Sequence, residues 1–370
     1  MKLKEIAAHV NQFIPQTLAQ DWDNTGLLIG DRERDIKNIL LTIDITKPVL
    51  AEALKSKTDL IISYHPVIWD GLKHITADGP ESIVYELIRS GIAVYSIHTA
   101  LDVLEGGVND ALAEIIGLKD PSPIGDYVQP PRKQNFKLVI YVPADSLNHL
   151  RQALFNAGAG HIGNYSQCSF HTTGEGSFLP HEGARPAIGK INRLEKVDEA
   201  RLETIIPQQN LPAVIDALKT AHPYETPAYD IFAIHDPAPL LGLGRIGLLA
   251  KPEKLDTLLE KIQKATGAKA AGLVAPKNTL IRKAAVCAGS CSQLINAVIA
   301  QKADLYLTGE LKHHHALAAQ HANLTCVCLT HSVSERFILK KLASQLQKKL
   351  KNVKITISKK DKDPFQWKMI

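Results

Sequence analysis

The chain has 370 residues, of which 45% are hydrophobic and 22% are charged. These are the proportions of an ordinary globular protein with two or three domains. Lys and Arg number 43 and Asp and Glu 38, and the resulting net charge of +5 is too small to favour a nucleic-acid-binding protein. Runs of about 18 apolar residues, as in a membrane helix, are absent from the sequence.

The first third of the chain alternates apolar strand-like runs with segments of helical spacing. The pattern predicts helices over 2–13, 47–56, 82–90 and 109–116, and strands over 38–44, 59–63 and 92–97. Strands that alternate with helices are typical of an α/β domain with a parallel or mixed sheet.

Two proline-containing segments, Asp120-Pro-Ser-Pro and Gln129-Pro-Pro-Arg, then predict a linker. After the linker, the elements follow the order β-α-β-β-α-β, which is the ferredoxin-like layout. The predicted elements are 137–142, 147–157, a hairpin-like stretch over 164–178, 197–206, 211–221 and 228–234. Asp236-Pro-Ala-Pro closes this insert.

The α/β pattern resumes after the insert. We expect helices over 255–265, 293–300, 314–322 and 334–347, and strands over 283–288, 304–307, 325–329 and 353–357. The predicted organisation is therefore an N-terminal α/β lobe at 1–127, an insert domain at 128–236 and a C-terminal α/β lobe at 237–370, which completes the domain of the site.

Four polar segments follow predicted strands, at 63–66, 98–102, 308–315 and 331–335. Sites in open α/β sheets form outside the carboxyl ends of the strands, so these four segments can converge. A helix that begins near Ser332 would put Glu335 on the same face as His331. Imidazoles and carboxylates together suit Zn, Fe or Mn, and a buried cluster of them without a cation would be costly.

Each of these residues also has a plainer interpretation. A histidine at the end of a strand usually makes an ordinary hydrogen bond, and Asp102 also suits a cap for the turn before Gly106-Gly107. The residues 242–247 match the letters GxGxxG, but they follow a proline-rich segment and no helix opens at Gly247, so we interpret them as the entry to a strand. The lysine-rich stretch 341–362 is typical of a solvated helix face.

The cysteine content favours a reducing compartment. No CxxC pair occurs, and no apolar run follows Met1, so we expect no signal peptide, a cytoplasmic location and reduced, buried thiols. The five cysteines are Cys168, Cys287, Cys291, Cys326 and Cys328.

Several motifs, in order, resemble those of the Nif-three-like family, also known as GTP cyclohydrolase I type 2 homologs. They are WDNTGLLIG (22–30), IISYHPVIWDGLKHI (61–75), HTALDVLEGGVNDALAE (98–114), ADLYLTGELKHHHALAA (303–319) and LTHSVSERFILKKLA (329–343). The insert resembles the PII- or CutA-like middle domain of the family's long form, through residues 157–180 and 218–231. The resemblance spans nearly the whole chain.

The resemblance implies a two-lobed Nif-three-like α/β fold that is interrupted by a ferredoxin-like insert. It also implies a dinuclear centre of divalent ions and a homohexamer that forms a ring. Carried over to this sequence, the metal ligands are His65, Asp102, His331 and Glu335, with Glu335 placed to bridge two ions.

Two residues depart from the family pattern. Tyr64 stands where most bacterial members have a second histidine, and a tyrosine binds a hard metal only as phenolate, against a free pKa of about 10. We therefore expect one or two divalent ions per chain, Zn, Fe or Mn. Cys291 stands where the family often has glycine, in a loop beside the expected site.

The first hypothesis for the function is a metal-dependent hydrolase that acts on a nucleotide-like or phosphorylated small molecule. Tyr64 and His98 are the candidate catalytic residues, which would orient substrate or transfer a proton. The alternative is a non-enzymatic, hexameric metal-binding or regulatory assembly. A ring that encircles nucleic acid is a weaker hypothesis, because the net charge is small.

Overall fold

A computed structural model describes residues 1–125, 135–234 and 241–368. The chain divides into two compact units: unit 1, formed by Met1–Pro130 and Pro239–Ile370, and unit 2, formed by Pro131–Ala238. The predicted linker segments Gln129-Pro-Pro-Arg and Asp236-Pro-Ala-Pro lie outside the described residues. Among the described helices, none is long and apolar enough to cross a membrane.

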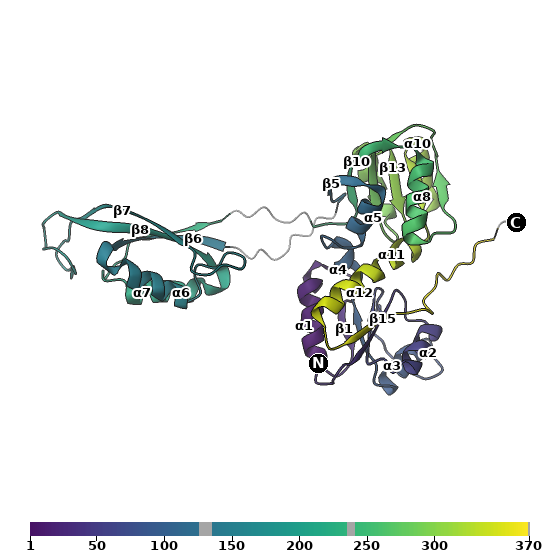
Figure 1. Cartoon of the computed structure of the whole chain (residues 1–370), viewed down its shortest axis with the longest axis horizontal. Helices are drawn as coiled ribbons and strands as arrows, with labels where there is room; N and C mark the ends of the chain where they lie inside the picture. Colours follow the sequence, from purple (N-terminus) through teal and green to yellow (C-terminus); the bar gives the residue numbers. More distant parts are fainter. Residues whose placement is uncertain (126–134, 235–240, 369–370) are drawn as a thin grey trace. The chain divides into compact units, whose positions relative to one another are not determined.

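The first sheet of unit 1 has the strand order β1-β4-β3-β2-β15 (Figure 1). Only β1 is antiparallel to its neighbour. Its strands are β1 (Gly26–Ile29), β2 (Asn38–Thr42), β3 (Leu60–Ser63), β4 (Ala93–Ser96) and β15 (Lys354–Ile357). One face packs on α2 (Lys47–Lys55) and α3 (Ser82–Arg89), and the other on α1 (Leu3–Phe13) and α12 (Ile338–Lys349). Both faces are covered, which explains why β3 and β4 are continuous apolar runs.

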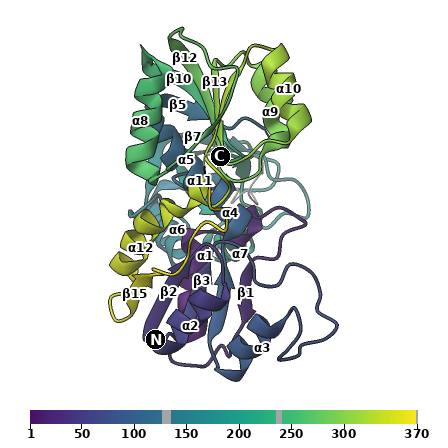
Figure 2. The same cartoon turned by 90° about the vertical axis from the view of Figure 1, so that its right-hand side faces the viewer.

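The second sheet of unit 1 has the order β11-β14-β13-β12-β10-β5, and its middle strands β12, β13 and β14 are parallel. Its strands are β5 (Leu118–Ser122), β10 (Arg245–Glu253), β11 (Gly272–Val274), β12 (Ile281–Cys287), β13 (Leu305–Thr308) and β14 (Thr325–Cys328). Figure 2 shows α5 (Val108–Ile116) and α8 (Leu255–Thr266) on one side of this sheet and α9 (Ile295–Ala300) and α10 (His313–His321) on the other.

Each sheet of unit 1 takes a strand from the other half of the chain. The strand β5 precedes the insert but pairs with β10, and β15 near the end of the chain pairs in parallel with β2. The prediction of a linker at Asp120-Pro-Ser-Pro is thus wrong for its first residues, which belong to β5. Proline is compatible with this strand because β5 lies at the sheet edge, and the register passes over Pro121.

Unit 2 has the predicted β-α-β-β-α-β order, with an antiparallel sheet β7-β8-β6-β9. Its elements are β6 (Asn135–Pro143), α6 (Leu147–Asn156), β7 (Ser169–Phe178), β8 (Glu195–Pro207), α7 (Leu211–Ala221) and β9 (Tyr229–Ala233). Both helices pack on one face of the sheet, against strand residues such as Leu138 of β6 and Leu202 of β8. On the opposite, open face, Phe170 is 66% and Phe232 55% exposed.

Four local features complete the comparison with the sequence. The GxGxxG segment leads into β10 at Arg245, as expected for a strand entry. The residues after Ile97 form a short helix, α4 (His98–Val103), which the pattern did not predict. The helix expected over 334–347 is two helices, α11 (Val333–Arg336) and α12. Cys287 and Cys291 form a disulfide, so the expectation of reduced thiols is wrong for this pair.

Candidate metal centre

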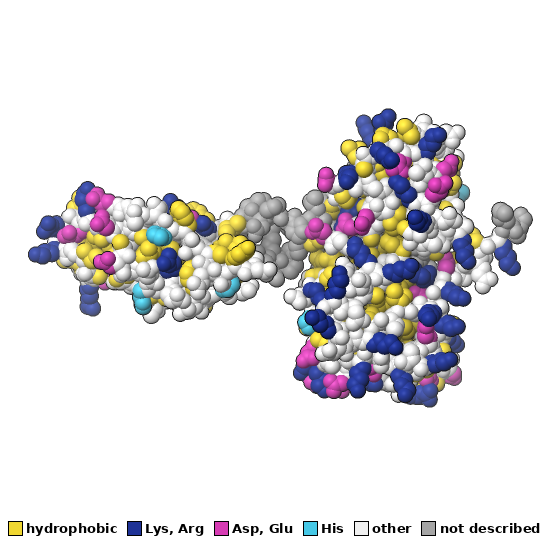
Figure 3. Space-filling model, in the orientation of Figure 1, with side chains coloured by type: hydrophobic (Ala, Val, Ile, Leu, Met, Phe, Trp, Pro, Cys, Tyr) yellow, Lys and Arg dark blue, Asp and Glu magenta, His cyan; other side chains and the backbone are white. Residues whose placement is uncertain are grey.

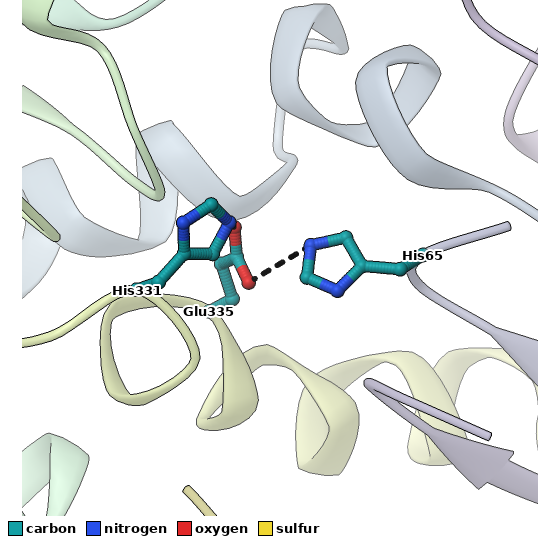
Figure 4. Close-up of side chains that lie close together, drawn as sticks. All are labelled: His65, His331 and Glu335. Atoms are coloured by element: carbon teal, nitrogen blue, oxygen red, sulfur yellow. Dashed lines mark ion pairs between the residues drawn. The ribbon is translucent and has the colours of Figure 1, made fainter. Parts of the chain in front are cut away.

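Three predicted ligands meet between the two sheets of unit 1. His65 follows β3 of the first sheet, whereas His331 and Glu335 follow β14 of the second. Their ligand atoms lie within 4.8 Å of one another. The Nε2 atom of His65 is 3.5 Å from Glu335 Oε2, and the Nε2 atom of His331 is 3.3 Å from Glu335 Oε1. Figure 4 shows the two imidazole rings on either side of the Glu335 carboxylate.

A further carboxylate holds the other ring nitrogen of each histidine. Asp44 Oδ1 lies 2.8 Å from His65 Nδ1, and Glu310 Oε1 lies 3.0 Å from His331 Nδ1. Such a partner fixes the tautomer and aims Nε2 at a metal, which is the usual arrangement around metal-bound histidine. The sequence analysis did not assign either carboxylate, although Asp44 ends a predicted strand and Glu310 lies in one of the four polar segments.

The charges of the site stabilise one another. Burial would raise the pKa of Glu335, but the His331 and His65 imidazoles outweigh it and lower this pKa to about 2. Burial would lower the pKa of His65, yet Asp44 and Glu335 raise it to about 10. The Glu335 carboxylate raises the pKa of His331 to about 9, against the effect of burial. The Glu335 carboxylate is therefore ionised at neutral pH. It lies between two imidazoles, each of which can either hold a proton or bind a cation.

The donor set fits a divalent cation. Glu335 is 3% exposed, and its Oε2 is buried without a hydrogen-bond donor among the described residues. A β-carbon at Gly289, whose φ is +69°, would lie 2.6 Å from Glu335 Oε1, so the loop after β12 approaches the carboxylate as only glycine allows. Two imidazole nitrogens and a carboxylate with one oxygen free of hydrogen bonds from the described residues are suitable ligands for Zn, Fe or Mn.

Asp102, the fourth predicted ligand, is not part of this group of three. It sits in α4, lines the same cavity, and accepts a hydrogen bond from the Tyr64 hydroxyl. Burial is the main reason that its pKa is raised to about 6. Burial and the Asp102 charge likewise raise the pKa of Tyr64 well above 10, so its phenol remains a proton donor to Asp102.

His98, the other candidate catalytic residue, is paired with Asp23. His98 is 8% exposed, and its Nδ1 lies 2.9 Å from Asp23 Oδ1. The second oxygen, Asp23 Oδ2, accepts the backbone N–H of Thr99 at 3.1 Å. Burial would raise the pKa of Asp23, but hydrogen bonds from His98 and Thr99 lower it. The Asp23 carboxylate therefore fixes the orientation of the His98 ring through its contact with Nδ1.

The sequence analysis missed Asp23, although it is the second residue of the motif that begins at Trp22. Its partner His98 lines a cavity of about 400 Å³ together with the three candidate ligands and Asp102. Trp22 and Trp69 also line this cavity, with their rings edge-on to His98 at 5.8 and 5.3 Å. Cys291 lines it too, on the loop that carries Gly289. Tyr64 lies behind Asp102 and not on the cavity wall.

Comparison with known proteins matches residues 1–364 to the family described as Duf34/NIF3 (NGG1p interacting factor 3). The chain belongs to this family. A Bacillus subtilis relative named "GTP cyclohydrolase 1 type 2 homolog" is 37% identical over 366 residues, 98% of this chain and 97% of the relative. A Listeria innocua relative of the same name is 33% identical over 370 residues, 98% of each chain. The family resemblance expected from the motifs is thus confirmed.

Solved structures agree with this Duf34/NIF3 assignment. A Bacillus cereus protein related to NIF3 has a TM-score of 0.76, with 36% identity and 99% of each chain covered. A Staphylococcus aureus protein has a TM-score of 0.78, with 28% identity and the same coverage. The family fold, including the insert, is therefore shared along the chain.

Proposed function

We propose that this Duf34/NIF3 protein is a metal-dependent hydrolase that acts on a nucleotide-like or phosphorylated small molecule. The observation that carries the proposal is the buried Glu335 carboxylate between two imidazole nitrogens, in a cavity that is also lined by His98, the partner of Asp23. His65, His331 and Glu335 would hold a divalent ion, Zn, Fe or Mn. A divalent ion at these ligands would act as a Lewis acid toward water and a substrate oxygen.

The residues of the chain supply the proton transfers. His98 Nε2 accepts the proton from the attacking water and later returns it to the leaving group. Asp23 stabilises the imidazolium that forms in between, and it holds the ring in one orientation. Asp102 is a positioning residue or a further ligand, and Tyr64 orients it through their hydrogen bond.

The cavity walls favour a flat aromatic substrate. The indoles of Trp22 and Trp69 are 64% and 53% exposed, so a base can stack on them. His65 and Trp69 also line an adjoining trough of about 1050 Å³, whose wall includes Lys360 and Lys362. In the described part of the chain these two lysines form no ion pair, and they are suited to bind a substrate phosphate. The name of the curated relatives, GTP cyclohydrolase 1 type 2 homolog, agrees with a purine nucleotide.

Turnover of a purine and pyrimidine nucleotide panel, measured with Zn, Mn and Fe in turn, tests the proposal. We expect hydrolysis by the wild type, with a kcat roughly 100-fold lower in His98→Ala at unchanged metal content. Asp102→Ala and His331→Ala serve as controls. The proposal fails if no nucleotide is hydrolysed faster by the wild type than by His331→Ala.

A second candidate function is a regulatory or metal-holding homohexamer without catalysis. The exposed Phe170 and Phe232 on the open sheet face of unit 2 favour contact with a second copy of the chain. Native mass spectrometry would show six chains in the wild type and fewer in the variant Phe170→Asp/Phe232→Asp. Nucleic acid is less favoured as a partner, because on the face in Figure 3 the Lys and Arg side chains of unit 1 are interspersed with Asp and Glu.

A further inference from the structure

Unit 2 contains a cavity of its own, of about 440 Å³. Its floor is the open face of the sheet, where Tyr141, Phe178 and Glu199 belong to β6, β7 and β8. Its walls are the segments 179–187, between β7 and β8, and 224–228, between α7 and β9. The volume lies within the range of small-molecule sites, roughly 300–1,000 Å³.

One wall of this cavity is aromatic and held rigidly. The rings of Phe178 and Tyr224 meet edge to face, with centroids 5.6 Å apart. His222, buried beneath Tyr224, binds the backbone oxygen of Tyr141 through Nε2 at 2.9 Å and accepts the backbone N–H of Tyr224 at Nδ1, 3.1 Å away. Both ring nitrogens are therefore used to fix the turn that presents Tyr224.

The charge of the lining has one sign. Glu182, Glu199 and Glu225 line the cavity, and neither lysine nor arginine does. Within the described residues, none of the three glutamates forms an ion pair. The Glu199 carboxylate accepts the Tyr224 hydroxyl at 3.0 Å, and Glu225 accepts the backbone N–H of Arg185 at 2.9 Å. Two carboxylates are thus held in place by neutral donors, a phenol and a backbone amide.

The backbone also makes room for one of these carboxylates. A β-carbon at Gly176 of β7 would lie 2.1 Å from Glu199 Oε2, whereas a β-carbon at Gly174 would meet nothing within 4 Å. The Glu199 carboxylate therefore lies flat against β7, and within the cavity it contacts the Tyr224 hydroxyl.

The geometry points to unit 2 as the binding site of a small organic cation, such as an amine or a guanidinium compound. Its charged group binds Glu199 and Glu225, and its carbon skeleton packs on Phe178 and Tyr224. Aromatic faces and carboxylates together attract an organic cation. A divalent metal fits less well, because the group of metal ligands found among the described residues lies in unit 1 and includes none of these glutamates.

Calorimetric titration of the full chain with butylamine, putrescine, arginine and choline tests the inference, with butyrate as the anionic control and at fixed ionic strength. We expect at least one cation to bind, and its Kd to rise at least tenfold in Glu199→Gln and in Glu225→Gln. Glu175→Gln, an exposed carboxylate of β7 outside the cavity, should leave the Kd unchanged. Metal content and melting temperature are measured for each variant.

Glu225 is exposed, so Glu225→Gln carries the test if Glu199→Gln does not fold. The inference is overturned if none of the four cations binds with a Kd below about 10 mM, if the two variants bind as tightly as wild type, or if butyrate binds instead.

Discussion

The two cavities have similar volumes, about 400 and 440 Å³, and both combine carboxylates with aromatic rings, yet we propose different cations for them. In unit 1 the Glu335 carboxylate is 3% exposed and faces two imidazole nitrogens. In unit 2 Glu199 and Glu225 are more exposed, are held by a phenol and a backbone amide, and face aromatic rings. On the two proposals, the neighbours of a carboxylate, more than its presence, would select a metal ion or an organic cation.

The largest effect that separates the cavities is expected from His331→Ala. This change removes one of three convergent donors and leaves the buried Glu335 with His65 alone. We expect metal affinity to fall by about 100-fold or more, and amine binding in unit 2 to remain unchanged. Competition with a chromogenic chelator measures the metal affinity, and calorimetry measures the amine binding. Equal metal affinity in the wild type and in His331→Ala would show that His331 is not a metal ligand.

Gly289→Ala is the next test, with Gly117→Ala as its matched control. Both glycines have a left-handed backbone, with φ of +69° and +80°, but only at Gly289 would a β-carbon strike the Glu335 carboxylate. Each change costs about 1–2 kcal/mol of stability for the backbone strain. Only Gly289→Ala should also weaken metal binding, by roughly 10-fold or more. Chelator competition on both variants measures the effect of the contact with the Glu335 carboxylate. Equal losses of metal affinity in the two variants would contradict this role of the contact.

The pH dependence of stability of the metal-free chain should reflect the ion pairs of Glu335. The pKa values of His65 and His331 lie above their unfolded value near 6.5, so their contribution is full below pH 6.5 and disappears as the pH rises through about 9 and 10. The Glu335 pKa is depressed, so its contribution is present above pH 4.5 and lost as the pH falls through about 2.

Between pH 6.5 and 10, the melting temperature of the metal-free wild type should therefore decline more than that of metal-free His331→Ala. We expect a difference of a few degrees, because His331 is 38% exposed and partly screened. With saturating metal the trend reverses, since deprotonated imidazoles bind the ion. Calorimetric scans across this range would contradict the account if the two metal-free proteins had parallel profiles.

The smallest effect is expected in unit 2, from Gly176→Ala. Its β-carbon displaces the Glu199 carboxylate, which is the far end of a flexible side chain, so we expect the Kd for the bound amine to rise only several-fold. Gly174→Ala, on the same strand with open space around it, is the control. Calorimetric titration of both variants with the same amine would contradict the packing argument if Gly174→Ala were equally impaired.

Local patterns in the sequence predict most elements but not how the two sheets share strands. The continuous apolar run at 59–63 marks β3, and the polar segments after two of the parallel strands, β3 and β14, mark His65, His331 and Glu335 as candidates that meet. Nothing local predicts that β15 pairs with β2, because parallel pairing of strands so far apart in the chain depends on tertiary packing. The edge strand β5 was missed because its Pro121 reads as a linker.

The hydrogen-bonded carboxylate–histidine pairs of the site could not be predicted from the sequence either. The links Asp44–His65, Glu310–His331 and Asp23–His98 join residues more than 20 positions apart, and they depend on side-chain directions at neighbouring strand ends. The sequence left the role of Tyr64 open between a metal ligand and a catalytic group. In the structure it is a buried donor to Asp102, a role that only the tertiary contact between the residue after β3 and α4 reveals.

Elemental analysis of the purified chain tests the central claim most directly, after reconstitution with Zn, Mn or Fe, beside Glu335→Ala and Tyr64→His. The account predicts a stoichiometrically bound divalent metal in the wild type and its loss in Glu335→Ala. Tyr64→His, which replaces a phenol that binds Asp102, should retain this metal or bind a second one. Absence of metal from the reconstituted wild type, or full retention in Glu335→Ala, would contradict the site.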